Sequence, residues 1–155
     1  MARDVPGSVV NSMRVLGLVV ATSAVITVLT WLMRDEVILG WAQGNPSAQE
    51  LLAQGGIEQL RESPIVPGFV ALAVVAFIVF AILALVLASF FMGGHGWARQ
   101  VLSGVALVGV LVGAVCLDRH LPAIFVVLSA VVIVEGVVLL WFLWRRDTTA
   151  YLRRS

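Results

Sequence analysis

The sequence predicts an all-α membrane protein: an antiparallel bundle of four transmembrane helices, with a short amphipathic extracytoplasmic helix between the first two. Hydrophobic residues make up 61% of the 155 residues, against about 45–50% in soluble domains. Four apolar runs reach the length that a helix needs to cross a bilayer, about 20 residues. A basic run follows the last of them. A chain of this length is expected to form a single domain, residues 1–155.

The first apolar run covers residues 15–33 and follows a polar N-terminal stretch. A signal peptide has the same order of charge and apolar core, but its core is about 7–15 residues and ends at a small-residue cleavage site. This run is longer and ends in Trp31, Leu32 and Met33. We therefore expect an uncleaved first transmembrane helix.

Residues 34–64 form the longest polar segment, which is expected to lie outside the membrane on the outer side. Val37, Ile38 and Trp41 recur at helical spacing. This spacing predicts that the first helix continues beyond the bilayer. Ser63 and the proline that follows it mark the end of the segment, because proline disfavours helical backbone before it.

A short amphipathic helix is predicted between about residues 46 and 61. Asn45 is a favourable N-cap, and Pro46 suits the first helical position. The apolar side of this helix should rest against the bundle or in the membrane interface. That side consists of Leu51, Leu52, Ile57 and Leu60.

Residues 66–91, 100–117 and 122–144 are the second, third and fourth predicted spans. The connections at residues 93–96 and 118–120 are short. Short connections make consecutive helices antiparallel neighbours. We therefore expect spans two, three and four to lie side by side.

The distribution of arginine predicts that both termini are cytoplasmic. All ten basic residues are arginine, and the predicted spans divide them unequally. The side with more basic residues is cytoplasmic by the positive-inside rule. We therefore expect a multi-pass protein of the bacterial plasma membrane. The inner side carries Arg3, Arg14, Arg99, Arg145, Arg146, Arg153 and Arg154, and the outer side carries Arg34, Arg61 and Arg119.

Glu135 is the only ionisable residue deep in a predicted span, and it is the candidate intramembrane polar site. A charge at the bilayer centre costs about 2.5–3.5 kcal/mol on insertion scales, so the carboxyl should face the bundle and be protonated at pH 7. Matching depths along the spans brings it near Thr22 or Ser23. In a structural interpretation it donates a hydrogen bond to a neighbouring helix; in a functional one it relays a proton or a cation. The structural interpretation is preferred, because a relay usually needs more than one titrating group.

Gly109 and Gly113 form a Gly-x-x-x-Gly pattern in the third span. Small residues at this spacing let two helix backbones approach closely. Helix packing inside the monomer is the preferred interpretation, and a dimerisation face is the alternative.

Two segments at the predicted inner interface place tryptophan close to arginine. Trp97 is followed by Arg99, and Trp144 by Arg145 and Arg146. An aromatic belt with snorkelling cations explains these residues as anchors in the lipid bilayer. The C-terminal arginines are also expected to attract anionic lipids, at about 1 kcal/mol per cation.

No pattern in the sequence carries an enzymatic mechanism, and we expect a non-enzyme with no cofactor, metal or nucleic-acid partner. Cys116 is the only cysteine, which excludes an intramolecular disulfide and a Cys-x-x-Cys pair. His95 and His120 lie at opposite ends of one apolar segment, too far apart to share a metal.

Two functions therefore stay open. The first is a structural or interaction subunit that packs as a homo-oligomer or against a larger membrane partner. The second is a small proton-coupled transporter or carrier that uses Glu135. Spans two and three are almost wholly apolar, which favours the first.

Three interfacial segments carry a resemblance to known proteins. They are Pro-Gly-Ser-Val-Val at 6–10 with Arg14, Gly-Trp-Ala-Arg at 96–99, and the segment 140–151; Asn-Pro-Ser at 45–47 fits as well. In these segments the chain resembles a family of uncharacterised small four-span integral membrane proteins common in actinobacteria. The resemblance covers nearly the whole chain and implies the four-span topology. It implies no activity, substrate or catalytic residue.

Overall fold

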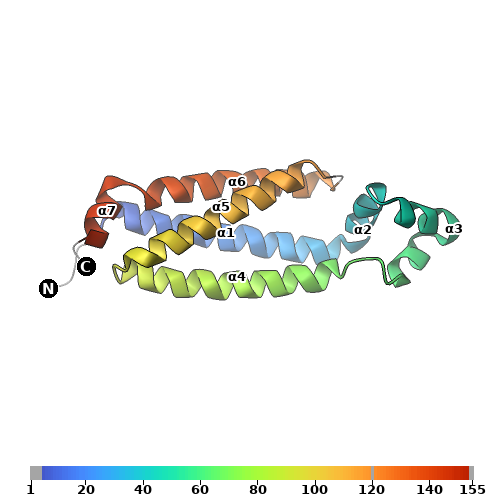
Figure 1. Cartoon of the computed structure of the whole chain (residues 1–155), viewed down its shortest axis with the longest axis horizontal. Coiled ribbons are helices and arrows are strands. Elements are labelled where there is room, and N and C mark those ends of the chain that lie inside the picture. The colour runs from blue at the N-terminus through green and yellow to red at the C-terminus, as the bar shows by residue number, and fades with distance from the viewer. Residues whose placement is uncertain (1–4, 120, 154–155) are drawn as a thin grey trace.

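The computed structural model describes residues 5–119 and 121–153, and every regular element within them is an α-helix. Of the seven helices in the described residues, four are long; two shorter ones and a short one make up the rest. The long helices lie side by side, with the two shorter helices beyond one end of them and the short helix at the other end (Figure 1). The four long helices are long and apolar enough to cross a membrane. The predicted all-α, four-span membrane fold is therefore confirmed.

Each predicted span corresponds to one of the four long helices, α1, α4, α5 and α6. The largest difference is at the start of α1, which begins at Gly7 rather than at residue 15. The bounds are α1 Gly7–Leu32, α2 Arg34–Gln43, α3 Pro46–Glu62, α4 Phe69–Met92, α5 Gly96–Leu117, α6 Ala123–Leu143 and α7 Arg146–Arg153.

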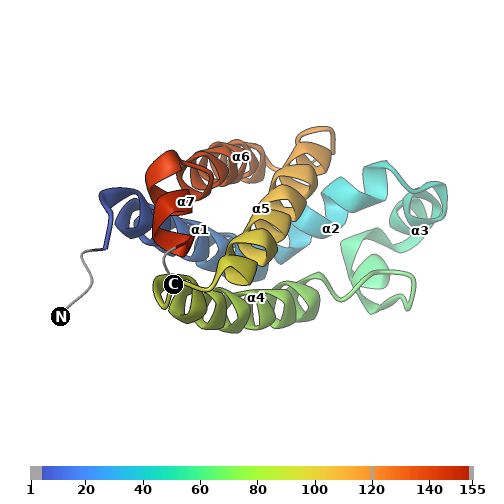
Figure 2. The ribbon, with the colours of Figure 1, turned by 60° about the vertical axis from the view of Figure 1, so that its left-hand side comes forward.

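The four long helices pack as neighbouring pairs around one core. The most extensive interface joins α5 to α6, followed by α1 with α6 and α1 with α4. Figures 1 and 2 both show α5 crossing the bundle obliquely, from α4 at one end to α6 at the other. The buried apolar core consists of Val9, Leu16, Ala84, Leu87, Phe91, Ala98, Leu102, Ala106, Leu139 and Leu143.

Glycines on both helices allow the close approach of α5 and α6. A Cβ on Gly113 would lie 2.9 Å from Ile133 Cγ1 and 3.2 Å from the carbonyl oxygen of Ser129. A Cβ on Gly136, in α6, would lie 2.7 Å from Val110 Cγ2. Neither position has room for a larger side chain without movement of the facing helix.

Gly109 does not share this interface. Outside its own helix backbone, no atom lies within 4 Å of where its Cβ would be. The predicted Gly-x-x-x-Gly pair is thus not one packing surface inside the monomer. Because α5 crosses the bundle obliquely (Figures 1 and 2), positions one turn apart along it do not meet the same neighbour. Gly136 on the facing helix gives a second close approach, against Val110 and the carbonyl oxygen of Ala106, which the pattern in α5 did not indicate.

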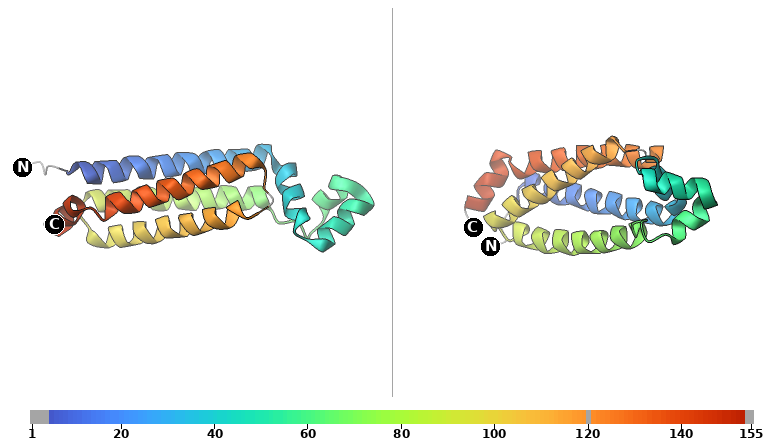
Figure 3. Two further views of the ribbon diagram at one scale, coloured as in Figure 1. Left: turned by 90° about the horizontal axis from the view of Figure 1, so that it is seen from above. Right: turned by 45° about the vertical axis from the view of Figure 1, so that its right-hand side comes forward.

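Beyond α1 the chain stays helical but changes direction. Met33, with φ −108° and ψ 33°, lies between α1 and α2 and interrupts the helix. Figure 3 shows α2 turned away from the axis of α1. Val37 and Ile38 of α2 are buried. The predicted helical continuation is therefore present, as a separate helix rather than a straight extension.

The predicted amphipathic helix is present as α3. The side chain of Asn45 accepts a hydrogen bond from the backbone N of Ala48 at 3.4 Å, and Pro46 is the first helical residue. Gly56 has a φ of +70°, which interrupts the helix with a kink. Glycine adopts this conformation without the steric cost that a Cβ would add.

A second small core holds α3 against α2. Leu60 is fully buried there with Ile38 and Ala42, and the predicted apolar residues Leu51 and Leu52 pack partly against them. Ile57, the fourth predicted residue, is half-buried. An ion pair of 2.6 Å between Arg61 Nη2 and Asp35 Oδ2 joins the same two helices.

Both ends of the described chain lie at one end of the bundle. Figure 1 shows the start of α1, the turn from α4 to α5 and the helix α7 together there. The helices α2 and α3, the end of α5 and the start of α6 lie at the opposite end (Figure 1). This arrangement follows from an even number of spans, and it gathers side chains from distant parts of the sequence at the α7 end.

Candidate functional site

Thr148 joins three helices at the α7 end of the bundle. Its side chain is fully buried. Its Oγ1 donates to the carbonyl oxygen of Phe142 at 2.9 Å and lies 3.0 Å from Ser8 Oγ. Ser12 Oγ in turn donates to the carbonyl oxygen of Ser8 at 2.9 Å. These bonds connect α7 to the start of α1 and to the end of α6.

Arg99 reaches from α5 toward α6 and α7. Its Nη1 donates to Thr149 Oγ1 at 3.0 Å, and its Cζ lies 4.4 Å from the centroid of the Trp144 ring. A guanidinium over an indole face is a favourable cation–π contact. Trp144 Nε1 donates to Ser103 Oγ at 3.0 Å. The buried Arg99 Nε has no hydrogen-bond partner among the described residues.

The other predicted interfacial anchors lie at the same end. Arg145 Cζ is 5.0 Å from the centroid of the Trp141 ring, and Arg145 Nη2 is 4.0 Å from Asp147 Oδ2. Trp97 packs on Phe90, with ring centroids 5.0 Å apart. Trp97 and Arg99 belong to the first turn of α5, and Trp144, Arg145 and Arg146 lie where α6 ends and α7 begins. All five are therefore at one end of the bundle, where Arg99 and Trp144 are in direct contact.

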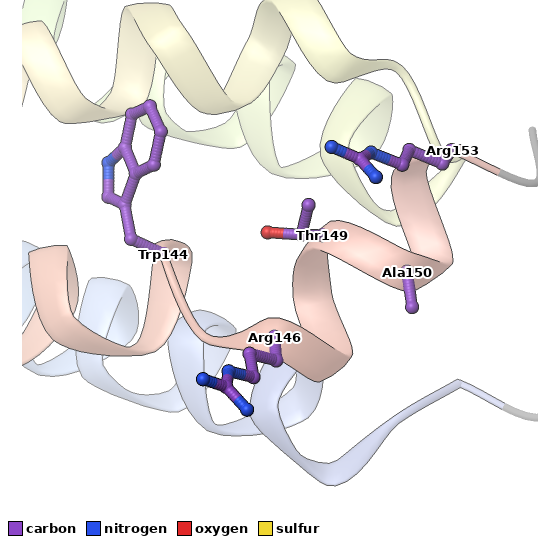
Figure 4. A pocket seen from close by; sticks show the side chains of 5 residues that line it. All are labelled: Trp144, Arg146, Thr149, Ala150 and Arg153. Carbon is purple, nitrogen blue, oxygen red and sulfur yellow. The ribbon is translucent and has the colours of Figure 1, made fainter.

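An open pocket of about 440 Å³ lies between Trp144 and α7. In Figure 4 the guanidinium groups of Arg146 and Arg153 and the hydroxyl of Thr149 extend from α7 toward the side on which Trp144 lies. The lining residues are Trp144, Arg146, Thr149, Ala150 and Arg153.

The return of α7 onto the bundle was not predicted from the sequence. Local signals for a helix are present, because Asp147 in the first turn and Arg153 in the last complement the helix dipole. Tyr151 and Leu152 pack against the core, and Tyr151 Oη donates to the carbonyl oxygen of Met92 at 2.6 Å. The apolar side chains of Tyr151 and Leu152 in this otherwise polar segment were the available sign that it packs on something, but they do not indicate where.

The second polar site lies inside the bundle, where α1 faces α6. Thr22 Oγ1 donates a hydrogen bond to Glu135 Oε1 at 2.9 Å. Glu135 Oε2 is buried and has no partner among the described residues. Ser23 instead donates to the carbonyl oxygen of Val19 at 2.8 Å. Thr22, and not Ser23, is therefore the partner, and the carboxyl accepts in this bond where we expected it to donate.

The remaining hydroxyls of α1 beyond Thr22 are satisfied within their own helix. Thr27 donates to the carbonyl oxygen of Ser23 at 2.9 Å, and Thr30 to that of Ile26 at 2.8 Å. They do not extend the polar contact at Glu135 along the span. Within residues 5–119 and 121–153, no three His, Cys, Asp or Glu side chains are placed to hold a metal ion.

No protein-family model, curated protein sequence or solved structure matches the chain. What the protein does is therefore inferred from the contacts at these two places, the α7 end and the Thr22–Glu135 pair.

Proposed function

We propose that this protein is a non-enzymatic structural or interaction subunit of the bacterial plasma membrane. It assembles with a second copy of itself or with a larger membrane partner. The observation that carries the proposal is the 2.9 Å bond between Thr22 and Glu135. A polar contact between two spans in hydrocarbon holds helices together, which gives the one deeply placed carboxyl a structural role.

A small proton-coupled transporter or carrier is the second candidate. The observation that favours it is Glu135 Oε2, which is buried without a partner among the described residues. An ionisable group inside a span is a starting point for a proton relay. A relay needs further polar groups along its path, however, and the hydroxyls of Ser23, Thr27 and Thr30 are each bonded within α1. This arrangement favours the structural role.

Extraction from its native membrane in a mild detergent tests the subunit proposal. We expect a discrete complex larger than a single 16.6 kDa chain with its detergent, on a native gel and after crosslinking in the membrane. We expect the complex to survive Glu135→Gln, which keeps the acceptor for Thr22. The proposal would be contradicted by a protein that is monomeric both on the native gel and after crosslinking, and that takes up protons in liposomes.

Both termini are proposed to be cytoplasmic. Arginine is unequally distributed between the two ends of the bundle. Those of the seven inner-side arginines that the structure describes belong to segments at the α7 end. Arg3 and Arg154, which we also assigned to that side, lie outside the described residues. The positive-inside rule then makes the α7 end cytoplasmic and places α2 and α3 outside.

Reporter fusions test this orientation. A reporter that works only outside the cytoplasm should be silent after Ser155 and active when inserted within residues 44–56. A reporter that works only in the cytoplasm should give the opposite pattern at the same two positions, which controls for expression. An extracytoplasmic reporter active at the C-terminus would reverse the topology.

We also propose that the chain is a member of the actinobacterial four-span group that it resembles. Segments that carry the resemblance are distant in sequence but lie in contact at the α7 end. Ser8 Oγ is 3.0 Å from Thr148 Oγ1, and Arg99 Nη1 is 3.0 Å from Thr149 Oγ1. Contacts among these segments support a shared role for them in such a group.

A further inference from the structure

The pocket between Trp144 and α7 contains two cationic groups without anionic partners. Arg146 and Arg153 both line it. Among the described residues, no carboxylate oxygen lies within 4.0 Å of either guanidinium, whereas the neighbouring Arg145 is 4.0 Å from Asp147. Both guanidinium groups are therefore available to an anion from outside the chain.

Arg99 adds positive charge behind the pocket. It contacts two lining residues, by its bond to Thr149 Oγ1 and by its position over the Trp144 ring. The hydroxyl of Thr149 also donates to the carbonyl oxygen of Arg145 at 3.1 Å, so it is held in place from both sides. Guanidinium groups match the oxygens of a phosphate with paired N–H donors. The chemistry of the pocket thus suits a phosphate group.

The apolar surface next to the pocket indicates that the phosphate belongs to a lipid. Val134, Val137 and Trp141 of α6 and Trp144, which caps that helix, are all exposed and follow one another at intervals of three or four residues. Residues at this spacing share one face of a helix, so this stripe runs along the span and ends at the pocket. A free phosphate would use only the pocket, whereas a phospholipid would use the pocket and the stripe.

We propose that this pocket binds the phosphate of an anionic phospholipid, whose acyl chains lie along the exposed stripe of α6. The proposal depends on the membrane location of the four helices and is independent of the choice between subunit and transporter. It also gives α7 a role: the bonds of Thr148 to α6 and α1 hold Arg146 and Arg153 near the end of the stripe.

Lipid titration of the purified full chain in mild detergent tests the site. Phosphatidylglycerol, phosphatidylcholine and glycerol phosphate are added separately, and binding is measured by native mass spectrometry. We expect phosphatidylglycerol to bind at least about tenfold more tightly than phosphatidylcholine, because each cation near an anionic headgroup adds about a factor of five. Glycerol phosphate should bind weakly, because it lacks the chains that contact α6.

The double variant Arg146→Gln with Arg153→Gln should lose at least about tenfold in affinity for phosphatidylglycerol. The control is Arg34→Gln with Arg119→Gln, which removes the same charge at the opposite end of the bundle and should bind as the unmodified protein does. Equal melting curves without lipid would show that all variants are folded. An equal loss of affinity in the control variant would show that phosphatidylglycerol responds only to the net charge of the protein. Equal binding of glycerol phosphate and phosphatidylglycerol would make the ligand a soluble phosphate, and either result would overturn the proposal.

Discussion

Gly113→Leu is expected to lower the free energy of unfolding of the bundle by about 1–3 kcal/mol, the usual cost of forcing extra carbon atoms into a packed interface. The first added atom, Cβ, would lie 2.9 Å from Ile133 Cγ1 and 3.2 Å from the carbonyl oxygen of Ser129. Ile133 can change rotamer, but the backbone oxygen cannot move without α6. The two helices must therefore separate along their most extensive interface. Thermal unfolding in detergent, followed by circular dichroism, measures the loss.

Gly109→Leu is the matched control for this substitution. It makes the same change one turn earlier on the same helix, where no atom outside the helix backbone lies within 4 Å of the added Cβ. We expect its melting curve to stay close to that of the unmodified protein. Equal destabilisation by the two substitutions would contradict the α5–α6 interface described above. The Gly109→Leu variant could also lose its oligomer while its melting curve stays unchanged. That result would place Gly109 on a dimerisation face, the alternative interpretation of the Gly-x-x-x-Gly pattern.

Features that depend on one helix at a time could be predicted from the sequence. The four spans follow from the length and apolar character of each run. The amphipathic helix follows from Asn45, Pro46 and the spacing of its leucines. The partner of Glu135 could be narrowed to the hydroxyls of Thr22 and Ser23 by matching depth in the membrane. Depth depends only on the distance of a residue from the ends of its span.

Features that depend on how helices are rotated or on distant contacts could not be predicted. Thr22 and Ser23 have the same depth, and only the rotation of α1 decides which one faces α6. The same limit applies to Gly109 and Gly113, because the pattern does not say which glycine meets the neighbouring helix. The pocket beside α7 needs contacts across the chain, from Ser8 to Thr148, that no local signal indicates.

Glu135→Ala is expected to lower the free energy of unfolding by about 1–3 kcal/mol, since it leaves the Thr22 hydroxyl without its acceptor and opens a small void. Thr22→Val removes the donor and should destabilise in the same direction. In a double-mutant cycle the two changes should be coupled by about 0.6 kcal/mol, the average measured for hydrogen bonds between membrane helices, and by no more than about 1.7 kcal/mol. Thr27→Val is the control, because the Thr27 hydroxyl donates only to a carbonyl of its own helix, and it should show no coupling to Glu135→Ala. If the losses of stability in Thr22→Val and Glu135→Ala were simply additive, the hydrogen bond between these residues would not contribute to the stability of the fold.

Glu135→Gln is expected to separate the two candidate functions. The amide keeps a carbonyl oxygen where Oε1 accepts from Thr22, and its NH₂ group replaces Oε2, which has no partner among the described residues. Under the structural role the variant should therefore unfold within about 1 kcal/mol of the unmodified protein and keep its complexes. Under a relay it should fold normally yet lose function as completely as Glu135→Ala, because an amide cannot take up and release a proton at neutral pH. Proton uptake into liposomes distinguishes these outcomes, with Glu135→Asp as the variant that keeps a titratable group. Uptake by the unmodified protein that survives in the Asp variant and vanishes in a folded Gln variant would make this protein a carrier.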